Sequence, residues 1–174
     1  MSRADVQVEP AQDTDHAAIW AVLKPVIRAG ETYPLPRDWG KNQALAYWFS
    51  ASHRVYVARL DGRLVGTYYL RNNQSAGGDH VANAGYMTDP SARGRGVATA
   101  MCEHSLAAAA RLGFTAMQFN FVIANNQAAV ALWTRLGFAT VGRLPAAYRH
   151  PRLGLVDALV MHRFLDSEAG HSGS

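Results

Sequence analysis

Alternating apolar and polar residues predict two adjacent β-strands in the first half of the chain. His53–Leu60 and Arg63–Arg71 both read as strands, and the two residues between them, Asp61-Gly62, are typical of a tight hairpin turn. Val81–Thr88 predicts a third strand. Thr115–Ile123 is strongly apolar and rich in residues that favour strands, so it predicts a central one.

Apolar positions spaced three and four residues apart predict the helices. Asp13 is a candidate N-cap for the first helix, and Gly30 ends it. Val97–Leu112 carries one apolar face and stops at Gly113. Thr32–Pro36 contains two prolines, which exclude regular helix. The other helical segments are about Trp39–Ser50 and the stretch from Asn126 to Leu136.

The remaining segments complete one domain. Val6–Glu9 predicts the first strand, and Asn72–Asp79 is polar and glycine-rich, which indicates a loop. Phe138–Gly142 and Leu155–Phe164 predict the last two strands, with a long connection that contains Pro145, Pro151 and Gly154. We predict a single domain over residues 1–165 and a disordered tail over residues 166–174.

Composition indicates a folded domain and argues against several classes of protein. The chain has 174 residues, 49% of them hydrophobic, which suffices for one sizeable core. No apolar run approaches the ~18 residues of a membrane span, and the acidic N-terminal segment is unlike a secretory signal. The one cysteine, Cys102, permits no internal disulfide, and we interpret it as a buried structural thiol. We therefore expect a cytoplasmic protein.

The net charge of +4 raises the question of nucleic-acid binding. The arginines are scattered rather than clustered, so we expect no nucleic-acid partner. A polyanionic co-substrate explains a local excess of basic residues equally well.

A glycine-rich turn, Arg93-Gly94-Arg95-Gly96-Val97-Ala98, joins a predicted strand to a predicted helix. The first N–H groups of a helix have no partner within it, so this arrangement can cradle phosphate oxygens. The spacing is neither the dinucleotide-binding GxGxxG nor the nucleotide-binding GxxxxGK[ST] pattern.

This turn and a second motif together resemble the GCN5-related N-acetyltransferases, the GNAT superfamily. Arg93–Ala98 follows the family's acyl-CoA signature, Arg/Gln-x-x-Gly-x-Gly/Ala. Asn126–Phe138 is similar to its second motif, Asn-x-x-Ala-x-x-Leu-Tyr-x-x-x-Gly-Phe, at nearly every position. The resemblance covers roughly residues 50–165. It implies a single-domain α/β fold: a mixed central sheet flanked by helices, in which the strands Val81–Thr88 and Thr115–Ile123 splay apart.

By this resemblance the co-substrate is acetyl-CoA, and no metal is implied. The backbone at Tyr86, Met87 and Thr88 would bind the pantetheine arm and the acyl carbonyl as if the arm were an added strand. The N–H groups from Gly94 to Thr99 would hold the pyrophosphate. The expected cofactor-binding residues are Tyr86, Met87, Thr88, Arg93, Gly94, Arg95, Gly96, Val97, Ala98, Thr99, Asn126 and Trp133.

One position departs from the family pattern. The usual general acid is the Tyr of the second motif, where this chain has Trp133. The indole N–H is too weak an acid to protonate a thiolate, so we interpret Trp133 as a packing residue beside the cofactor sulfur. Tyr86, Tyr148 or water are alternative proton donors, and a thiol pKa of ~8.5 makes an acid dispensable.

No general base is assigned by the sequence. The strand Thr115–Ile123 has no Glu, which some relatives carry there. Asp157 is a carboxylate within an apolar strand, and we favour a salt bridge with Arg149 or Arg152 over a catalytic role. Tyr86, Asn83 and Asp157 remain the catalytic candidates, and a water-relayed proton with transfer by alignment of the reactants is the favoured mechanism.

Two polar residues indicate the acceptor site. Asn83 and Asn120 lie on the two strands that border the splay, where their amides could bind a carboxylate or an oxyanion. Between the first and second strands, Tyr33, Trp39 and Trp48 are candidates for the acceptor pocket wall, with core packing as the alternative for each.

These features resemble the L-azetidine-2-carboxylate N-acetyltransferases, which act on proline analogues. The resemblance rests on Asn83, Asn120 and Asn126, on Thr32-Tyr33-Pro34, and on the run from Tyr148 to Gly154. It implies that Asn83 and Asn120 hold the carboxylate of an imino acid, in a detoxification role.

The function expected from the sequence is direct, acetyl-CoA-dependent N-acetylation of a small amine, most simply a free amino or imino acid. The alternatives are acetylation of protein N-termini, lysines, polyamines or antibiotics, and a non-catalytic CoA-binding sensor. A homodimer is a further expectation, because members of the superfamily often dimerise.

Overall fold

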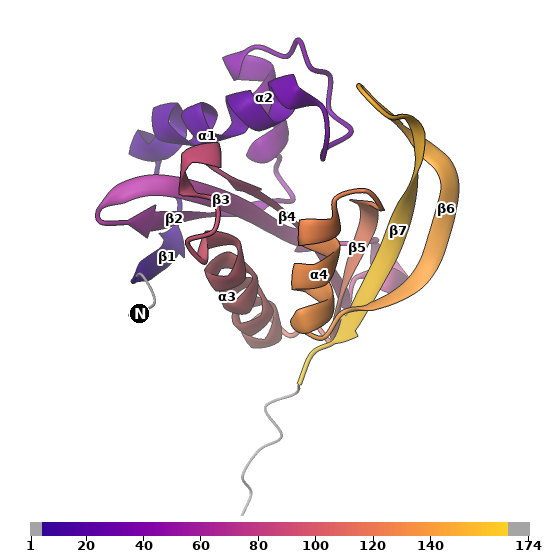
Figure 1. Cartoon of the computed structure of the whole chain (residues 1–174). Helices are drawn as coiled ribbons and strands as arrows, with labels where there is room; N and C mark the ends of the chain where they lie inside the picture. The colour runs from indigo at the N-terminus through magenta and orange to yellow at the C-terminus, as the bar shows by residue number, and fades with distance from the viewer. Residues whose placement is uncertain (1–4, 167–174) are drawn as a thin grey trace, which may run out of the picture.

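A computed structural model describes residues 5–166 as one seven-stranded sheet with helices on both faces (Figure 1). The strand order is β1-β2-β3-β4-β5-β7-β6, and every neighbouring pair is antiparallel except β4 and β5. The mixed α/β fold expected from the sequence is confirmed. The strands are β1 (Val6–Pro10), β2 (Arg54–Leu60), β3 (Arg63–Asn72), β4 (Val81–Thr88), β5 (Ala116–Ile123), β6 (Ala139–His150) and β7 (Gly154–Phe164).

The helices divide between the two faces of the sheet and create two cores. One face is covered by α1 (His16–Ala29) and α2 (Lys41–Trp48), and the other by α3 (Val97–Arg111) and α4 (Gln127–Arg135). Successive side chains of a strand point to opposite faces, so Tyr69 of β3 joins the α1–α2 core while Tyr68 joins the α3–α4 core. The predicted buried thiol, Cys102, lies fully buried on the inner face of α3.

The two halves of the sheet separate between β4 and β5. Their parallel pairing is limited to Val81 with Ala116 and Ala82 with Met117. Beyond this point the edge of β4 that faces β5 has no strand partner, and β5 is irregular between Phe119 and Val122. Backbone N–H and C=O groups are thereby left open in the middle of the molecule, where other groups must satisfy them.

Local turn signals were read correctly from the sequence. Asp61 and Gly62 form the β2–β3 turn with positive φ values of 50° and 77°, as a two-residue hairpin turn of this kind requires. Gly30 ends α1 in the left-handed conformation, with φ 62°. The expected loop at Asn72–Asp79 contains a short 3-10 turn, Ala76–Gly78, between β3 and β4.

The sequence-based prediction of the last hairpin was wrong. Residues 143–154 were expected to form a long connection, but β6 continues to His150 and only a tight turn separates it from β7. The pairing with β7 is interrupted between Leu144 and Tyr148, where Ala146 has a φ of 48°. A proline cannot donate to the ladder, and this bulge accommodates Pro145 without ending the strand.

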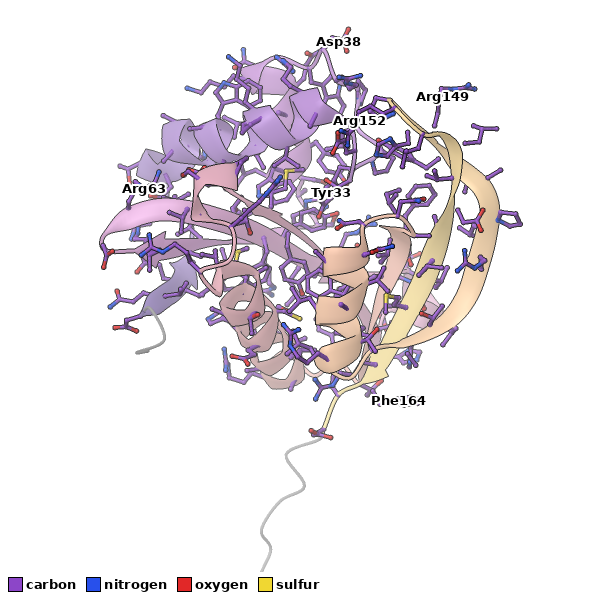
Figure 2. All side chains as sticks on the ribbon, viewed as in Figure 1. Tyr33, Asp38, Arg63, Arg149, Arg152 and Phe164 are labelled. Carbon is purple, nitrogen blue, oxygen red and sulfur yellow. The ribbon has the colours of Figure 1, made fainter. Side chains whose placement is uncertain are left out.

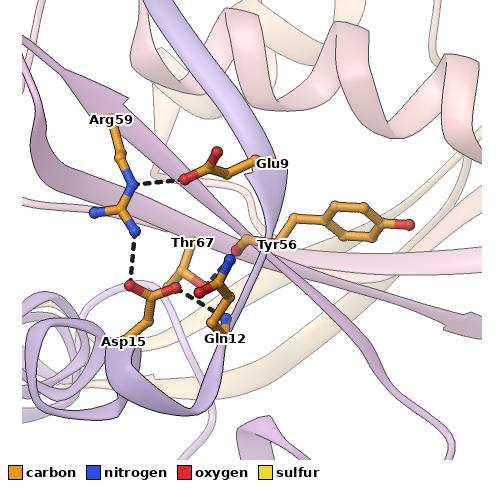
Figure 3. A network of polar contacts seen from close by, with 6 residues as sticks. All are labelled: Glu9, Gln12, Asp15, Tyr56, Arg59 and Thr67. Atoms are coloured by element: carbon orange, nitrogen blue, oxygen red, sulfur yellow. Dashed lines mark hydrogen bonds and ion pairs between the residues drawn. The ribbon is translucent and has the colours of Figure 1, made fainter.

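A buried carboxylate links β1, β2 and the start of α1 (Figure 3). Asp13 does not cap the first helix as predicted. Instead, Asp15 accepts a hydrogen bond of 2.9 Å from the Gln12 N–H and pairs with Arg59 at 2.7 Å. The same guanidinium pairs with the more exposed Glu9 at 2.7 Å. Burial favours a raised pKa for Asp15, but the Gln12 and Arg59 contacts outweigh it and hold this pKa below its ordinary value.

None of the helices within residues 5–166 is long and apolar enough to cross a membrane. The same residues contain no group of three His, Cys, Asp or Glu side chains arranged to hold a metal ion. Apart from Asp166, the predicted tail at residues 166–174 lies outside the described residues.

We predict that Asp15→Asn lowers the free energy of unfolding by about 1–3 kcal/mol near neutral pH, because a buried ion pair and its hydrogen bond are lost. The folded-state pKa of Asp15 is depressed, so its contribution is complete above the ordinary value of about 3.9 and fades as pH falls through the folded pKa. The difference in denaturant midpoint from the wild type should therefore stay constant near neutral pH and narrow only as pH falls below about 4.

Glu9→Gln is the matched control for this experiment. Glu9 pairs with the same guanidinium but its side chain is 48% exposed, so solvent screening limits its effect to about 1 kcal/mol or less. An equal loss in both variants would contradict the central role of Asp15.

Candidate active site

A cavity of about 650 Å³ occupies the gap between β4 and β5 and reaches both faces of the sheet. On the α3–α4 side it is lined by Arg93, Gly94, Ala98, Phe119, Asn126, Ala128, Ala129, Leu132 and Trp133. On the α1–α2 side it is lined by Thr32, Tyr33, Pro34, Tyr47, Tyr69, Arg71, Asn83 and Asn120. The open edge of β4, from Ala84 to Thr88, lies between these two halves.

The α3–α4 half has the features of a phosphate-binding turn. Gly94 and Gly96 have φ values of 76° and 82°, a conformation that glycine adopts readily, and Gly96 is the N-cap of α3. Asp89 holds the start of the turn through the Ser91 N–H at 2.9 Å, and Arg63 pairs with Asp89 at 3.1 Å. The free N–H groups of the first turn of α3 therefore stand beside the cavity, in a fixed loop, as an anion requires.

The predicted cofactor-binding residues do not all line the cavity. Those that do are Tyr86, Met87, Thr88, Arg93, Gly94, Ala98, Asn126 and Trp133. Arg95, Gly96, Val97 and Thr99 are not among the lining residues. Val97 is buried against Gly66, where an added Cβ would lie 2.9 Å from its side chain, and Arg95 is exposed, 3.9 Å from Asp61.

Backbone direction distinguishes the three residues predicted to bind the pantetheine arm. The Asp89 N–H bonds the Val65 carbonyl of β3, and alternate residues of an antiparallel strand direct their backbone groups to opposite edges. Met87 therefore faces β3 with its N–H and C=O groups. Those of Tyr86 and Thr88 face the open edge.

Tyr33 occupies this open edge. Its hydroxyl accepts a hydrogen bond of 2.6 Å from the Tyr86 N–H and donates one of 3.0 Å to the Tyr86 carbonyl. One phenol thus satisfies both backbone groups of Tyr86, which β5 leaves unpaired. Burial raises the pKa of Tyr33, so the hydroxyl keeps its proton at neutral pH.

Trp133 and Asn126 hold the other side of the cavity in place. Trp133 is buried against the rings of Tyr86 and Phe119, with centroid distances of 5.1 and 5.0 Å. Asn126 is the N-cap of α4, and its side chain accepts a hydrogen bond of 3.3 Å from the Ala129 N–H. The Tyr86 hydroxyl bonds Ser105 of α3 at 2.5 Å, and burial raises the pKa of Tyr86 well above its ordinary value. This hydroxyl is committed to α3 and poorly suited to deliver a proton.

Both acceptor-site asparagines have partners inside the protein. The Asn83 amide donates to the Gln118 carbonyl and accepts from Arg71, both at 2.9 Å. The Asn120 amide donates to Asn73 at 2.6 Å and accepts from the side chain of Gln118 at 2.9 Å. They border one side of the cavity, as their strands predicted, but much of their bonding capacity is used to fix neighbouring side chains.

Tyr47, Tyr69 and Arg71 are among the lining residues that sequence reasoning missed. Tyr69 crosses the face of Gly85, where an added Cβ would lie 2.7 Å from the ring, so glycine is required beside Tyr86. Arg71 pairs in register with Asn83 on the adjacent strand. The sequence contained the information needed to place Arg71. Arg71 lies two residues after Tyr69 on the same strand, so both side chains point to the same face of the sheet. Antiparallel pairing with the next strand then places Arg71 opposite Asn83.

Two tryptophans proposed for the pocket wall do not line the cavity. Trp48 is fully buried, and its indole N–H donates to Thr67 at 3.0 Å, so the core-packing alternative holds for it. Trp39 lies behind the wall, 5.8 Å from the ring of Tyr47, and Tyr47 is the residue that reaches the cavity. Helix α2 turns Tyr47 rather than either tryptophan toward the gap.

Asp157 lies away from the cavity, on β7. It forms a salt bridge, as favoured from the sequence, but its partner is Arg143 at 2.7 Å and not Arg149 or Arg152. A hydrogen bond from the Ala146 N–H and the charge of Arg143 hold the pKa of Asp157 below its ordinary value. The β6 bulge brings the Ala146 N–H and the Arg143 guanidinium to this carboxylate, so Asp157 stabilises the bulge.

A model of the acetyltransferase (GNAT) family matches residues 15–138. The chain belongs to this family. N-acetyltransferase aca1 from Schizosaccharomyces pombe is 29% identical in an alignment of 151 residues that covers 77% of this chain and 72% of that protein.

Solved structures agree with this assignment. A GCN5-related N-acetyltransferase from Kribbella flavida is 40% identical, with a TM-score of 0.88 over 92% of this chain and 98% of that one. YncA, a putative acetyltransferase from Salmonella typhimurium solved with its cofactor acetyl-CoA, shares the fold at 20% identity, with a TM-score of 0.80 over 97% of this chain and 99% of that one.

The protein is therefore an acetyl-CoA-dependent N-acetyltransferase. The geometry fits this co-substrate: open backbone groups of β4 lie between a glycine-rich phosphate turn and a buried aromatic wall. The co-substrate supplies an activated acetyl thioester. The protein supplies hydrogen-bonding groups and one continuous cavity that joins the two halves.

We predict that Tyr33→Phe binds acetyl-CoA about 2- to 10-fold more tightly, because the phenol no longer competes for the Tyr86 N–H. Calorimetric titration of acetyl-CoA into both proteins measures this difference. Tyr47→Phe is the matched control, because Tyr47 also lines the cavity but its hydroxyl contacts Tyr69 instead. Weaker binding by Tyr33→Phe alone would show that the phenol supports the bound thioester.

Proposed function

We propose that the enzyme transfers the acetyl group directly to the amine of a small free amino or imino acid. The amine nitrogen attacks the thioester carbonyl carbon, the new C–N bond forms as the C–S bond breaks, and the thiolate leaves with the bonding electron pair. The proton lost by the amine is passed through water and matches the one that the departing thiolate gains. Alignment of amine and thioester at the open edge of β4 supplies the catalytic effect.

The observation that carries this proposal is the attachment of the segment around Tyr33, which lines the cavity, to the β6–β7 hairpin. The Tyr148 hydroxyl of β6 donates to the carbonyls of Gly30 and, at 3.2 Å, Tyr33, and Arg152 pairs with Glu31 at 2.9 Å. Figure 2 shows Arg149 and Arg152 at the end of the β6–β7 hairpin beside the segment that joins α1 to α2. These contacts tie that segment over the cavity, which favours a small acceptor over a protein N-terminus or lysine side chain.

Charge argues against cationic acceptors. No Asp or Glu is among the described residues that line the cavity, and its two charged residues are both arginines, Arg71 and Arg93. Polyamines and aminoglycosides carry several positive charges and gain nothing from such a lining. A zwitterionic amino or imino acid is compatible with it, and the asparagines that resemble the proline-analogue branch favour L-azetidine-2-carboxylate.

A non-catalytic CoA-binding sensor is the alternative from another class. Trp133 replaces the usual tyrosine and supports this reading, since the proton donors considered for the thiolate have other partners. Turnover of any small amine decides against it.

We expect thiol release from acetyl-CoA with L-azetidine-2-carboxylate and other cyclic imino acids, and much less with polyamines, an aminoglycoside or a peptide with a free N-terminus. Asn120→Ala should raise the KM of the active acceptor about 5- to 50-fold, with a smaller effect on the KM of acetyl-CoA. Turnover only with peptides or polyamines would refute the small-acid acceptor. Binding of acetyl-CoA without turnover of any amine would favour the sensor.

The pH dependence of kcat/KM should follow the amine of the acceptor. No Asp, Glu or His is among the described lining residues, and burial raises the pKa of Tyr33, Tyr69 and Tyr86, so these phenols stay protonated at neutral pH. The rate should rise with pH as the acceptor amine loses its proton.

Two acceptors whose amine pKa values differ by about 1–2 units should give inflections displaced by the same amount. Rate profiles for both acceptors, measured with saturating acetyl-CoA, test this. One common inflection would instead reveal a base on the protein.

A further inference from the structure

Arg71 is a cation without an acidic partner at the acceptor end of the cavity. Its Nε donates to Asn83 at 2.9 Å, and none of the ion pairs formed within residues 5–166 includes its guanidinium. No other hydrogen bond of its side chain occurs among these residues, so the two terminal nitrogens, with four N–H donors, are available to the cavity.

The guanidinium is held in place by a short chain of contacts. Asn83 is 6% exposed, and it is fixed by donating to the Gln118 carbonyl while it accepts from Arg71. Because the hydrogen bond uses Nε, the planar fork of the two terminal nitrogens keeps its orientation and stays free. Such a fork is complementary to a carboxylate, which it can bind through two parallel hydrogen bonds.

The position of Arg71 is suited to a ligand that reacts at Tyr86. Arg71 pairs with Asn83, three residues before Tyr86 on β4, a separation of about 10 Å along a strand. Its charge acts on the Tyr69 hydroxyl, which lies across Gly85, directly beside Tyr86. Arg71 therefore lines the same cavity as the open edge of β4, with its Nε held at Asn83 and its charge near the Tyr69 hydroxyl.

The cavity has a matching charge at its other end. Arg93 is the first residue of the phosphate turn, and Arg71 and Arg93 are the charged side chains among the described lining residues. One end of the cavity thus fits the phosphates of the co-substrate, and the other end carries a second, separate positive charge.

We propose that Arg71, oriented by Asn83, is the anchor for the carboxylate of the acceptor and makes the enzyme specific for amines that carry an acid group. This inference rests on the proposed function, and it assigns Asn83 a positioning role. Asn83 and Asn120 each have one amide N–H that is not used in these contacts, and it can donate a further hydrogen bond to the same carboxylate. Asn83→Ala is then expected to weaken acceptor binding mainly because the Arg71 guanidinium loses the hydrogen bond that orients it.

The test compares acid and amide forms of the same acceptor: L-proline and L-azetidine-2-carboxylate against their carboxamides. Arg71→Gln should raise the KM of each acid about 10- to 100-fold with a smaller change in kcat, and should leave the carboxamides within about 2-fold. Arg71→Lys should restore part of the loss for the acids, because it keeps the charge but not the fork. Asn83→Asp should also impair the acids, because its carboxylate would neutralise Arg71.

Arg54→Gln is the matched control. Arg54 is an exposed arginine on the neighbouring strand β2, outside the cavity lining, and its removal makes the same change in net charge. Acetyl-CoA affinity, measured by calorimetry, should be equal in the wild type, Arg71→Gln and Arg54→Gln, which shows that each variant is folded. Equal losses with acids and carboxamides in Arg71→Gln would overturn the anchor.

A direct binding measurement separates this inference from the proposed function. L-Proline and L-prolinamide are titrated calorimetrically into the wild type and Arg71→Gln in the presence of CoA. If L-proline binds the wild type and loses affinity in the variant but is never acetylated, the anchor stands and the proposed function fails. If the wild type does not discriminate L-proline from L-prolinamide, the anchor is refuted whatever the enzyme acetylates.

Discussion

The fold depends on the early end of pairing between its two central strands. β4 and β5 are parallel neighbours for only two residue pairs, whereas on its other edge β5 pairs with β7 from Ala116 to Ile123. Buried backbone groups that lack a partner are costly, so a stable protein must cover the open edge of β4 with something else. Tyr33 does this with one hydroxyl that both donates to and accepts from Tyr86. An edge satisfied by a single side chain can exchange that partner for a ligand, which a strand partner would not permit.

The same opening explains why the cavity has two chemically different halves. A sheet normally separates the cores on its two faces, but here one cavity passes through the gap and borders both. The α3–α4 face contributes a helix N-terminus, glycines and an aromatic wall, whereas the α1–α2 face contributes tyrosines, asparagines and Arg71. Two reactants can therefore approach β4 from opposite faces and meet at its edge without sharing a binding surface.

The sequence predicted the α3–α4 half of the cavity lining better than the α1–α2 half, and the reason is the range of the interactions. The glycine turn, the Asn126 cap and the strand before them are local patterns, set within a few residues. The acceptor half depends on contacts between distant segments: Tyr33 with Tyr86, and Tyr148 with the Gly30 carbonyl. Whether Trp48 or Tyr47 faces the cavity is decided by the rotation of α2 against the sheet, and periodicity alone does not determine it. The β6 bulge was read as a loop because Pro145 ends most strands, although a bulge can contain it.

The placement of charge in the cavity offers an explanation of how the acetyl group could be transferred directly, without a general acid or base from the protein. Arg71 and Arg93 line opposite halves of the cavity, and under the proposed function they would attract the anionic parts of the two reactants toward opposite ends and leave the reacting groups between them. Holding the amine and the thioester in this order removes much of the entropic cost of bringing them together. The tyrosines between the arginines are kept protonated by burial and form a wall that does not compete for the amine proton. In such a site, specificity for the acid group of the acceptor and alignment of its amine depend on the same contact, so selecting the acceptor also orients it for reaction.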